Sequence, residues 1–271
     1  MIAKYESFLS RFFTKLNPIQ KLCKKYKIEN YTINSDGSID VNGNVRINGC
    51  NLNEIPLKFK KVSGKFDCSN NNLISLEGCP QEVGEHFNCE RNNLTSLEGG
   101  PTIVGGSYIC SDNSLTSLKY SPEKIRINFI CINNKLTSLD GGPTKVDGDY
   151  FCSRNKLTSL YGSPYKIGYD FDCSYNELIS LEGRPISIGT EFNFRHNHIT
   201  SIDFFNYKIK VKFKNNPVYD LIRLFTTKRI FLSSLDYGYL RGNKIIKKRF
   251  EEALSEVGKN VPNNIGGYQY I

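Results

Sequence analysis

The stretch FNCERNNLTSLEGGP at residues 87–101 decides the fold, because the chain repeats its pattern every 21 residues. The next copy reads YICSDNSLTSLKYSP at residues 108–122. Copies begin at Phe66, Phe87, Tyr108, Phe129, Tyr150, Phe171 and Phe192. Self-similarity with a period of roughly 20–50 residues is the signature of repeat architectures, in which each unit stacks on its neighbour. The sequence therefore predicts a solenoid.

Two columns of the repeat are predicted to face its interior. The first is aromatic, and the second, two residues later, is cysteine. The cysteine column holds Cys68, Cys89, Cys110, Cys131, Cys152 and Cys173, and then Phe194. Side chains two residues apart on a strand point to the same side. We therefore expect both columns to stack on their counterparts in adjacent repeats.

The rest of each copy turns and returns. An asparagine follows three residues after each cysteine, at 71, 92, 113, 134, 155, 176 and 197, and its amide can bond the backbone groups that a turn exposes. Two leucine columns, from Leu73 to Ile199 and from Leu76 to Ile202, fill the core. A proline at 80, 101, 122, 143, 164 and 185 favours an extended return over a helix, and Val or Ile follows three residues later. Glycines at 84, 105, 148, 168 and 189 support a tight return.

These columns resemble the leucine-rich repeat pattern L-x-x-L-x-L-x-x-N-x-L, with an aromatic residue and cysteine at two of the leucine positions. The resemblance covers about residues 45–203, and L-T-S-L followed by proline is similar to the short bacterial subclass. One degenerate copy precedes the regular set: Ile47 takes the cysteine position, Cys50 the asparagine position, and Leu52 and Ile55 the leucine positions. The resemblance implies a leucine-rich repeat solenoid, with a β-strand and an extended return in each repeat.

A second resemblance concerns the flanks. The segment KIENYTINSDGSIDV at residues 27–41, with NPVY at 216–219 and RGNKII at 241–246, resembles leucine-rich repeat proteins encoded in bacteriophage genomes. Bacterial relatives that enter host cells carry a separate ubiquitin-ligase domain. The roughly 68 residues after the repeats are too few for one, and no cysteine follows Cys173. That activity is not carried over.

Both ends of a solenoid need caps. We expect a helical and hairpin cap over residues 1–44, the solenoid over 45–203, and a basic helical cap over 204–271. At the first end, apolar residues at helical spacing predict a helix over 2–16, Asn17 and Pro18 begin a second, and turns at 36–37 and 42–44 mark a hairpin. At the other end, we expect a strand over 208–214 and helices from Asn216–Pro217 to about 225, near 228–237 and near 243–257, with residues 268–271 docking back on the core.

The net charge of +9 is uneven: +6 over residues 1–61, −5 over 62–203 and +8 over 204–271. This basic–acidic–basic order differs from the uniform basic stripe of a nucleic-acid groove. No apolar run is long enough for a membrane span, and the first 16 residues lack the apolar core of a signal peptide. We expect a cytoplasmic protein, in the host cytoplasm if it is phage-encoded.

Little in the sequence indicates catalysis. A column of one cysteine per repeat is predicted to pack as small hydrophobic groups rather than to converge on a metal. The three histidines, at 86, 196 and 198, and the scattered carboxylates form no evident acid–base pair. The glycines recur once per turn and form no phosphate loop. The sequence thus predicts no catalytic residue, no metal and no cofactor, and a protein that is not an enzyme.

A binding surface is predicted in the column between the aromatic and the cysteine, which faces outward on the expected concave face. This column is polar at its ends and apolar at Ile109, Ile130 and Phe151, and Ile132 joins the same patch. Arg91, Arg154, Tyr175 and His196 lie around it. An apolar centre with such a rim is typical of hot spots in protein interfaces. Two alternatives remain: Ile and Phe favour strands in general, or the C-terminal region or a second copy of the chain covers the patch.

The sequence therefore predicts a protein-binding module that docks a partner protein on its concave face. The phage resemblance implies an inhibitor of a host bacterial protein or immune component. Nucleic-acid binding through the basic ends ranks second, and sequestration of a small ligand such as a signalling nucleotide ranks third. The oligomeric state stays open.

Overall fold

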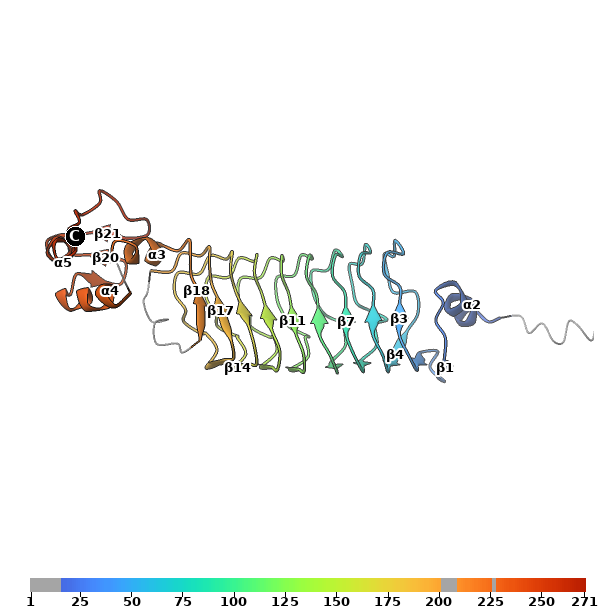
Figure 1. Ribbon diagram of the computed structural model, residues 1–271. Helices are drawn as coiled ribbons and strands as arrows, with labels where there is room; N and C mark the ends of the chain where they lie inside the picture. Colours follow the sequence, from blue (N-terminus) through green and yellow to red (C-terminus); the bar gives the residue numbers. More distant parts are fainter. Residues whose placement is uncertain (1–15, 201–208, 226–227) are drawn as a thin grey trace, which may run out of the picture.

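A computed structural model describes residues 16–200, 209–225 and 228–271. The chain forms a parallel β-solenoid with helix α2 (Pro18–Lys25) at one end and a unit of short helices and strands at the other (Figure 1). The predicted solenoid is confirmed. The helix expected over residues 2–16, apart from Leu16, and the leucine-column member Ile202 lie outside the described residues.

One sheet runs the length of the solenoid. Its nine parallel strands are β3 (Val45–Arg46), β5 (Phe66–Asp67), β7 (Phe87–Asn88), β9 (Tyr108–Ile109), β11 (Phe129–Ile130), β13 (Tyr150–Phe151), β15 (Phe171–Asp172), β17 (Glu191–Asn193) and β18 (Lys210–Lys212). Phe129 pairs with Tyr108 on one side and Tyr150 on the other, so residues 21 apart are direct neighbours. The strands stand side by side in one row along the solenoid (Figure 1).

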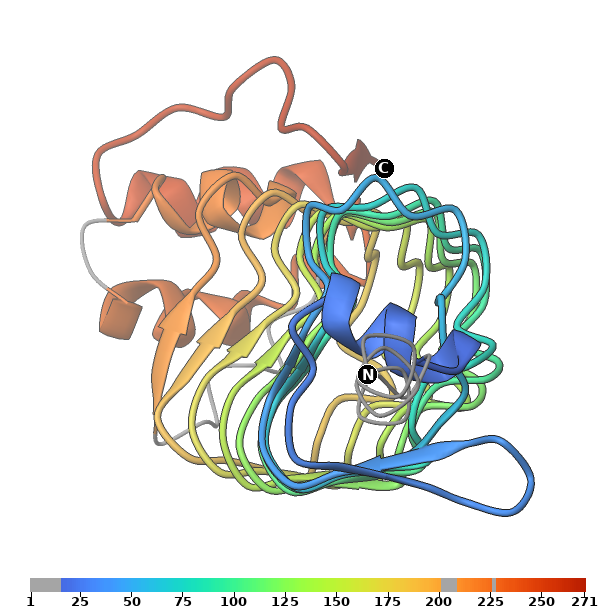
Figure 2. The ribbon, with the colours of Figure 1, turned by 90° about the vertical axis from the view of Figure 1, so that its right-hand side faces the viewer.

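The return side of each turn forms a second strand rather than only extended chain. A five-stranded sheet holds β1 (Tyr31–Ile33), β2 (Ile39–Val41), β4 (Phe59–Val62), β6 (Glu82–Val83) and β8 (Ile103–Val104). A four-stranded sheet holds β10 (Lys124–Ile125), β12 (Lys145–Val146), β14 (Lys166–Ile167) and β16 (Ser187–Ile188). The Val or Ile after each proline is buried. Figure 2, along the axis, shows these strands on a different side of the cross-section from the nine-stranded sheet.

The return strands are interrupted between β8 and β10, where no pairing joins the two sheets within the described residues. The turn that ends in β10 carries Tyr120 in a column that is glycine elsewhere, and its φ of 73° matches those glycines. A Cβ at the equivalent Gly141 would lie 2.9 Å from the backbone of Lys119. Tyr120 brings such a Cβ, so the turn cannot approach its predecessor as closely.

The interior follows the predicted columns. All aromatic and cysteine members from Phe66 to Phe194 are fully buried, and consecutive rings of the aromatic column have centroids 4.9–5.9 Å apart. The described members of both leucine columns are buried as well. This continuous core replaces the compact centre of a globular domain, because each repeat buries its apolar side against its neighbours.

The asparagine ladder is also confirmed. Oδ1 of Asn92 accepts from the backbone N–H of Leu73 at 3.0 Å, and its Nδ2 donates to the carbonyls of Cys68 and Cys89, both at 3.1 Å. One amide therefore ties two successive turns together. Asn216 is a further member of the ladder. It stands at the N-cap position of the helix that begins at Pro217, as expected, but its side chain makes no cap hydrogen bond. It bonds Ile199, Phe194 and Phe213 instead.

The return glycines are explained by close approach of the backbone. A Cβ at Gly84 or Gly105 would lie 2.0 Å from the carbonyl oxygen of the preceding turn, and one at Gly168 or Gly189 would lie 1.8 Å from it. Gly148 belongs to the neighbouring column, with a clash distance of 2.3 Å. Glycine at these positions lets the stacked turns approach closely, although Arg126 and Asp147 occupy the same column in the two turns between Gly105 and Gly168.

Helix α2 lies across the first end of the solenoid (Figure 2). Asn17 caps it as predicted: its side chain accepts from the Gln20 N–H, and the Gln20 side chain accepts from the Asn17 N–H. The hairpin of β1 and β2 follows. In the degenerate first turn Ile47, Leu52 and Ile55 are buried, whereas Cys50 is exposed and makes no ladder rung.

The C-terminal unit (residues 217–271) is more than a helical cap. It holds α3 (Pro217–Ile222), α4 (Lys228–Ser234), the 3-10 turn η2 (Leu235–Tyr237), β19 (Leu240–Arg241), β20 (Lys244–Ile245), α5 (Lys247–Ser255) and β21 (Gln269–Tyr270). The helix expected near 243–257 begins later because residues 244–245 form a strand. Three strands make a small sheet, and the unit has a hydrophobic core of its own. Of the residues 268–271 that were expected to dock on the core, Tyr268 donates its hydroxyl to the Thr200 carbonyl of the solenoid, whereas residues 269–271 pair with β20 inside the unit.

Candidate functional site

The predicted apolar strip (Ile109, Ile130, Ile132 and Phe151) lies on the outer side of the nine-stranded sheet. Ile130 pairs in register with Ile109 on β9 and with Phe151 on β13, so the three are side by side. Each side chain of the strip is half-buried rather than exposed. The strip is thus a shallow apolar surface at the middle of the sheet.

Beside the strip runs a ridge of residues with left-handed backbone, which we call the left-handed ridge. It is formed by Asn70, Arg91, Asp112, Asn133, Arg154, Tyr175 and His196, with φ between 51° and 57°. Each comes directly before a ladder asparagine. Asn and Asp tolerate this conformation, but other side chains with a Cβ pay roughly 1–2 kcal/mol for it. Histidine is also enriched there, so three of the seven ridge positions, Arg91, Arg154 and Tyr175, hold residue types that strain the backbone.

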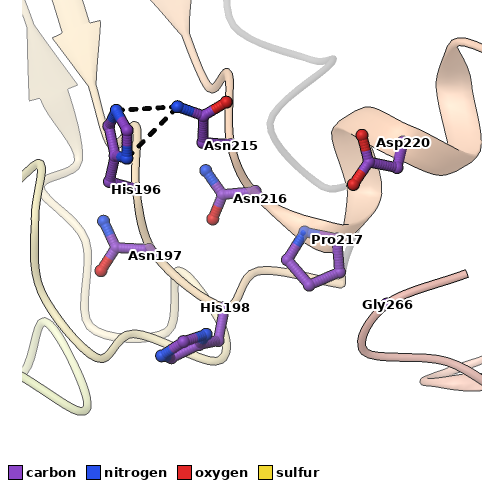
Figure 3. Close-up of a pocket in the computed structure, with 8 residues that line it drawn as sticks. All are labelled: His196, Asn197, His198, Asn215, Asn216, Pro217, Asp220 and Gly266. Atoms are coloured by element: carbon purple, nitrogen blue, oxygen red, sulfur yellow. Dashed lines mark hydrogen bonds between the residues drawn. The ribbon is translucent and has the colours of Figure 1, made fainter.

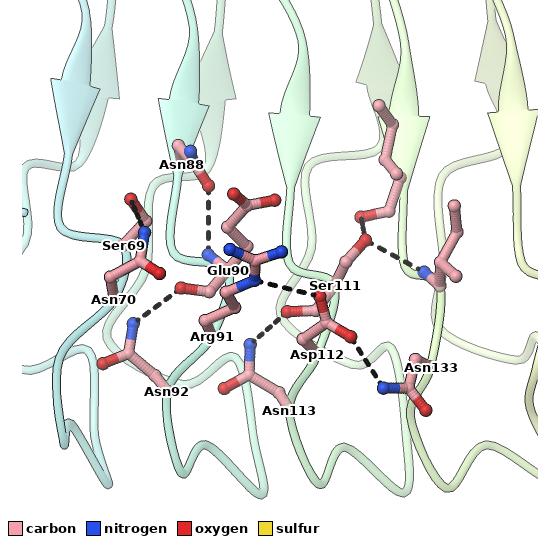
Figure 4. Close-up of polar contacts among 12 residues, drawn as sticks. Ser69, Asn70, Asn88, Glu90, Arg91, Asn92, Ser111, Asp112, Asn113 and Asn133 are labelled. Atoms are coloured by element: carbon pink, nitrogen blue, oxygen red, sulfur yellow. Dashed lines mark hydrogen bonds and ion pairs between the residues drawn. The ribbon is translucent and has the colours of Figure 1, made fainter.

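The side chains of the ridge contact one another along it. Nε of Arg91 lies 3.5 Å from Oδ2 of Asp112, whose Oδ1 accepts from Asn133 at 2.6 Å (Figure 4). Further along, the Arg154 guanidinium lies 5.2 Å from the Tyr175 ring centre, and the Tyr175 and His196 rings stack with centroids 4.1 Å apart. These contacts hold the planar groups of Arg154, Tyr175 and His196 in fixed positions, with Arg154 and Tyr175 exposed and His196 half-buried. The structure thus brings Arg154, Tyr175 and His196 together, and it places Arg91 in a separate group.

The ridge ends at a cavity of about 490 Å³ between the solenoid and the C-terminal unit (Figure 3). Its walls are mostly polar and include His196, His198, Asn215 and Asp220. Nδ2 of Asn215 lies 2.8 Å from Nε2 of His196 and so fixes the ring at the end of the stack. The sequence did not indicate Asn215, because only the fold brings it next to His196.

The sequence analysis also overlooked a second set of exposed apolar groups. They lie on and near the return strands: Ile103, Ile127, Tyr161, Tyr165, Tyr169 and Ile186, exposed by 43–88%. These residues scatter over several columns, so no single column of the repeat marks them. They offer a second surface for comparison with the predicted strip.

The cysteine column has the chemistry of a core. Burial raises the pKa of the Cys89, Cys110, Cys152 and Cys173 thiols well above the ordinary range. Such thiols stay protonated and act as small apolar groups. Within the described ranges, no three His, Cys, Asp or Glu side chains are placed to hold a metal ion.

Comparison with known proteins gave no family and no relative: no protein-family model matches the chain, and neither does any curated protein. Among the described residues, no helix has the length and apolar character to cross a bilayer.

Proposed function

We propose that the solenoid is a leucine-rich repeat module that docks a partner protein on the outer face of its nine-stranded sheet. The observation that carries this proposal is the left-handed ridge. Arg154 and Tyr175 occupy positions where asparagine would be less strained, yet their exposed side chains continue the stack that begins at the half-buried His196. Backbone strain kept at exposed positions supports a functional role, because strained residues cluster at functional sites.

The adjoining strip supplies the apolar part of the interface. Ile109, Ile130 and Phe151 form a continuous half-buried row, and Arg91 adds an exposed cation on the neighbouring ridge. Tyr and Arg are enriched among interface hot spots, and apolar centres with polar rims are their usual setting. The resemblance to bacteriophage proteins makes a bacterial protein in the host cytoplasm the expected partner, and inhibition the expected outcome.

The test uses variants that remove the interface while keeping the fold. Asparagine suits left-handed backbone, so Arg154→Asn with Tyr175→Asn should unfold no more easily than the wild type. Immobilised wild-type protein is incubated with bacterial lysate, the retained protein is identified, and its Kd is then measured with both components purified. We expect the double variant to bind at least about tenfold more weakly, since two hot-spot residues each contribute 1 kcal/mol or more.

The matched control lies on the return side. Ile103→Asp with Ile186→Asp changes two residues that are 60% and 88% exposed and should leave the Kd unchanged. Loss of binding in this control, with full binding by the ridge variant, would move the interface to the return strands. If the purified wild type binds no retained protein, the docking proposal is wrong.

A further inference from the structure

The C-terminal unit carries a cluster of cations, which we call the basic patch: Arg241, Lys244, Lys247 and Lys248. All four are exposed. Arg241 and Lys244 lie directly opposite each other on the β19–β20 hairpin, and Lys247 and Lys248 form the start of α5 one residue further on. Four cations therefore gather on one short hairpin and the helix that follows it.

This arrangement costs stability in the isolated protein. Like charges on directly opposite strand positions repel. Helix α5 has its cations at the N-terminus, where the helix dipole is positive, and carries Glu251, Glu252 and Glu256 towards the other end. The dipole favours the reverse distribution at both ends. A bound anion would relieve both repulsions.

Within the described ranges none of the four side chains of the patch forms an ion pair, although the oxygen of the last residue, Ile271, accepts from the Lys247 backbone N–H at 2.9 Å. Other lysines of the chain do form ion pairs: Lys210 and Lys212 share Glu191, and Lys145 pairs with Asp147. The C-terminal unit, residues 217–271, holds 9 Lys/Arg and 5 Asp/Glu and so carries +4, whereas residues 62–203 carry −5. A polyanion would therefore be drawn to the C-terminal unit and repelled by the solenoid.

We propose that the basic patch binds the phosphodiester backbone of double-stranded nucleic acid, apart from the protein-docking face. Backbone contacts need exposed cations and no shaped pocket, and lysine and arginine supply them. An anionic membrane fits less well. Membrane-surface helices insert an apolar face, but Phe250, Ala253 and Leu254 of α5 are buried in the unit's own core.

The test is fluorescence polarisation with labelled DNA and RNA duplexes of one sequence, at increasing salt. Four phosphate contacts predict an affinity loss of about 100-fold between 50 and 200 mM salt. The triple variant Lys244→Gln, Lys247→Gln and Lys248→Gln should bind at least about tenfold more weakly at 50 mM salt. The control Lys124→Gln, Lys145→Gln and Lys166→Gln removes the same charge from the return strands and should keep most of the affinity.

Thermal melting of both variants shows whether each still folds, and Arg241→Gln alone serves as a milder patch variant. Equal weakening by the patch and control variants would mean that binding follows net charge, and it would overturn the proposal. Binding to phosphatidylserine vesicles without binding to either duplex would overturn it in favour of a membrane. Absence of salt-dependent duplex binding by the wild type would overturn it outright.

Discussion

At the scale of single residues, the asparagine ladder supplies backbone hydrogen bonds that regular helices or wide sheets supply in other folds. Strands of two residues form few hydrogen bonds with their neighbours, and the turn after each strand would leave buried carbonyls without donors. Asn134 shows the solution: its Nδ2 donates to Cys110 and Cys131 in successive turns, and its Oδ1 accepts from Leu115. Each buried amide replaces several water contacts at once.

We predict that Asn134→Ala lowers the free energy of unfolding by about 3 kcal/mol or more, because it leaves several buried backbone groups unsatisfied. Urea denaturation monitored by circular dichroism measures this. Asn93→Ala is the control, since Asn93 is exposed two repeats earlier and should change stability by less than about 0.5 kcal/mol. Equal midpoints for the two variants would contradict the ladder's role.

Residue types alone predicted the inward columns and the ladder, because burial and amide chemistry leave a pattern of identical residues every 21 positions. They did not predict the left-handed ridge. Asn70, Asp112 and Asn133 are typical of such backbone, but Arg91 and Tyr175 in the same column conceal it. The sequence thus pointed to four ridge residues as an interface rim without showing that most of them are strained or that three of them stack.

At the scale of elements, Tyr120 separates the two return sheets. We predict that Tyr120→Gly restores pairing between β8 and β10 and raises the free energy of unfolding by about 1 kcal/mol, since glycine adopts φ 73° freely. Arg126 is a second possible cause of the break, because it brings a Cβ to a column that holds glycine in other turns. Asp147 brings a Cβ to the same column, yet β10 and β12 pair, so we assign the break to Tyr120.

Hydrogen exchange of the amides of residues 123–127 reports this directly, and they should exchange more slowly in the variant. Tyr165→Gly removes a tyrosine of similar exposure from ordinary backbone and should instead lower stability. Unchanged exchange in Tyr120→Gly would place the cause of the break elsewhere.

Strand β18, at the end of the nine-stranded sheet, is joined to β17 by the carboxylate of Glu191. Partial burial raises the pKa of Glu191, but its bonds to Lys212 and Lys210 outweigh this and hold the pKa below the ordinary value. A lowered folded pKa gives stability that is present above the unfolded value of about 4.3 and is lost as pH falls through the folded value. We predict that Glu191→Gln lowers the free energy of unfolding by about 0.5–1 kcal/mol at pH 7. The difference should vanish at a pH where Glu191 is protonated in both the folded and the unfolded state.

Chemical denaturation of wild type and Glu191→Gln from pH 7 to pH 3 measures this difference. Glu177→Gln, at an exposed carboxylate one repeat earlier, should show no such pH-dependent gap. A gap that persists at pH 3 would assign the effect to packing rather than to charge.

The sequence located the elements of the solenoid better than those of the C-terminal unit. Repetition marks each turn seven times over, so even two-residue strands could be inferred. β19, β20 and β21 occur once, and β20 pairs with β21 across 25 residues of chain. A strand of two residues is too short to show an alternation of apolar and polar positions. The sequence analysis therefore assigned Lys244 and Ile245 to the neighbouring helix.

At the scale of the whole molecule, the described residues form two hydrophobic cores. One runs from Cys23 to Val218 through every turn of the solenoid, and the other, from Leu221 to Tyr268, lies within the C-terminal unit. Ile222 packs against both. A solenoid is stabilised by contacts between neighbouring repeats, whereas a unit of about 55 residues is marginal alone. The two parts should therefore unfold at different temperatures.

We predict that Phe231→Ala, which removes a fully buried ring from the second core at a cost of about 3–5 kcal/mol, unfolds the C-terminal unit and leaves the solenoid's Tm nearly unchanged. Trypsin should then cleave the chain at Arg241 to Lys259 while the repeats stay intact. Phe129→Ala, at the middle of the aromatic column, should instead lower the Tm of the solenoid. One shared transition shifted equally by both variants would show that the cores unfold as a unit, with Ile222 and the Tyr268–Thr200 bond coupling them. Separate transitions would let the solenoid keep a partner docked while the C-terminal unit unfolds and releases its polyanion.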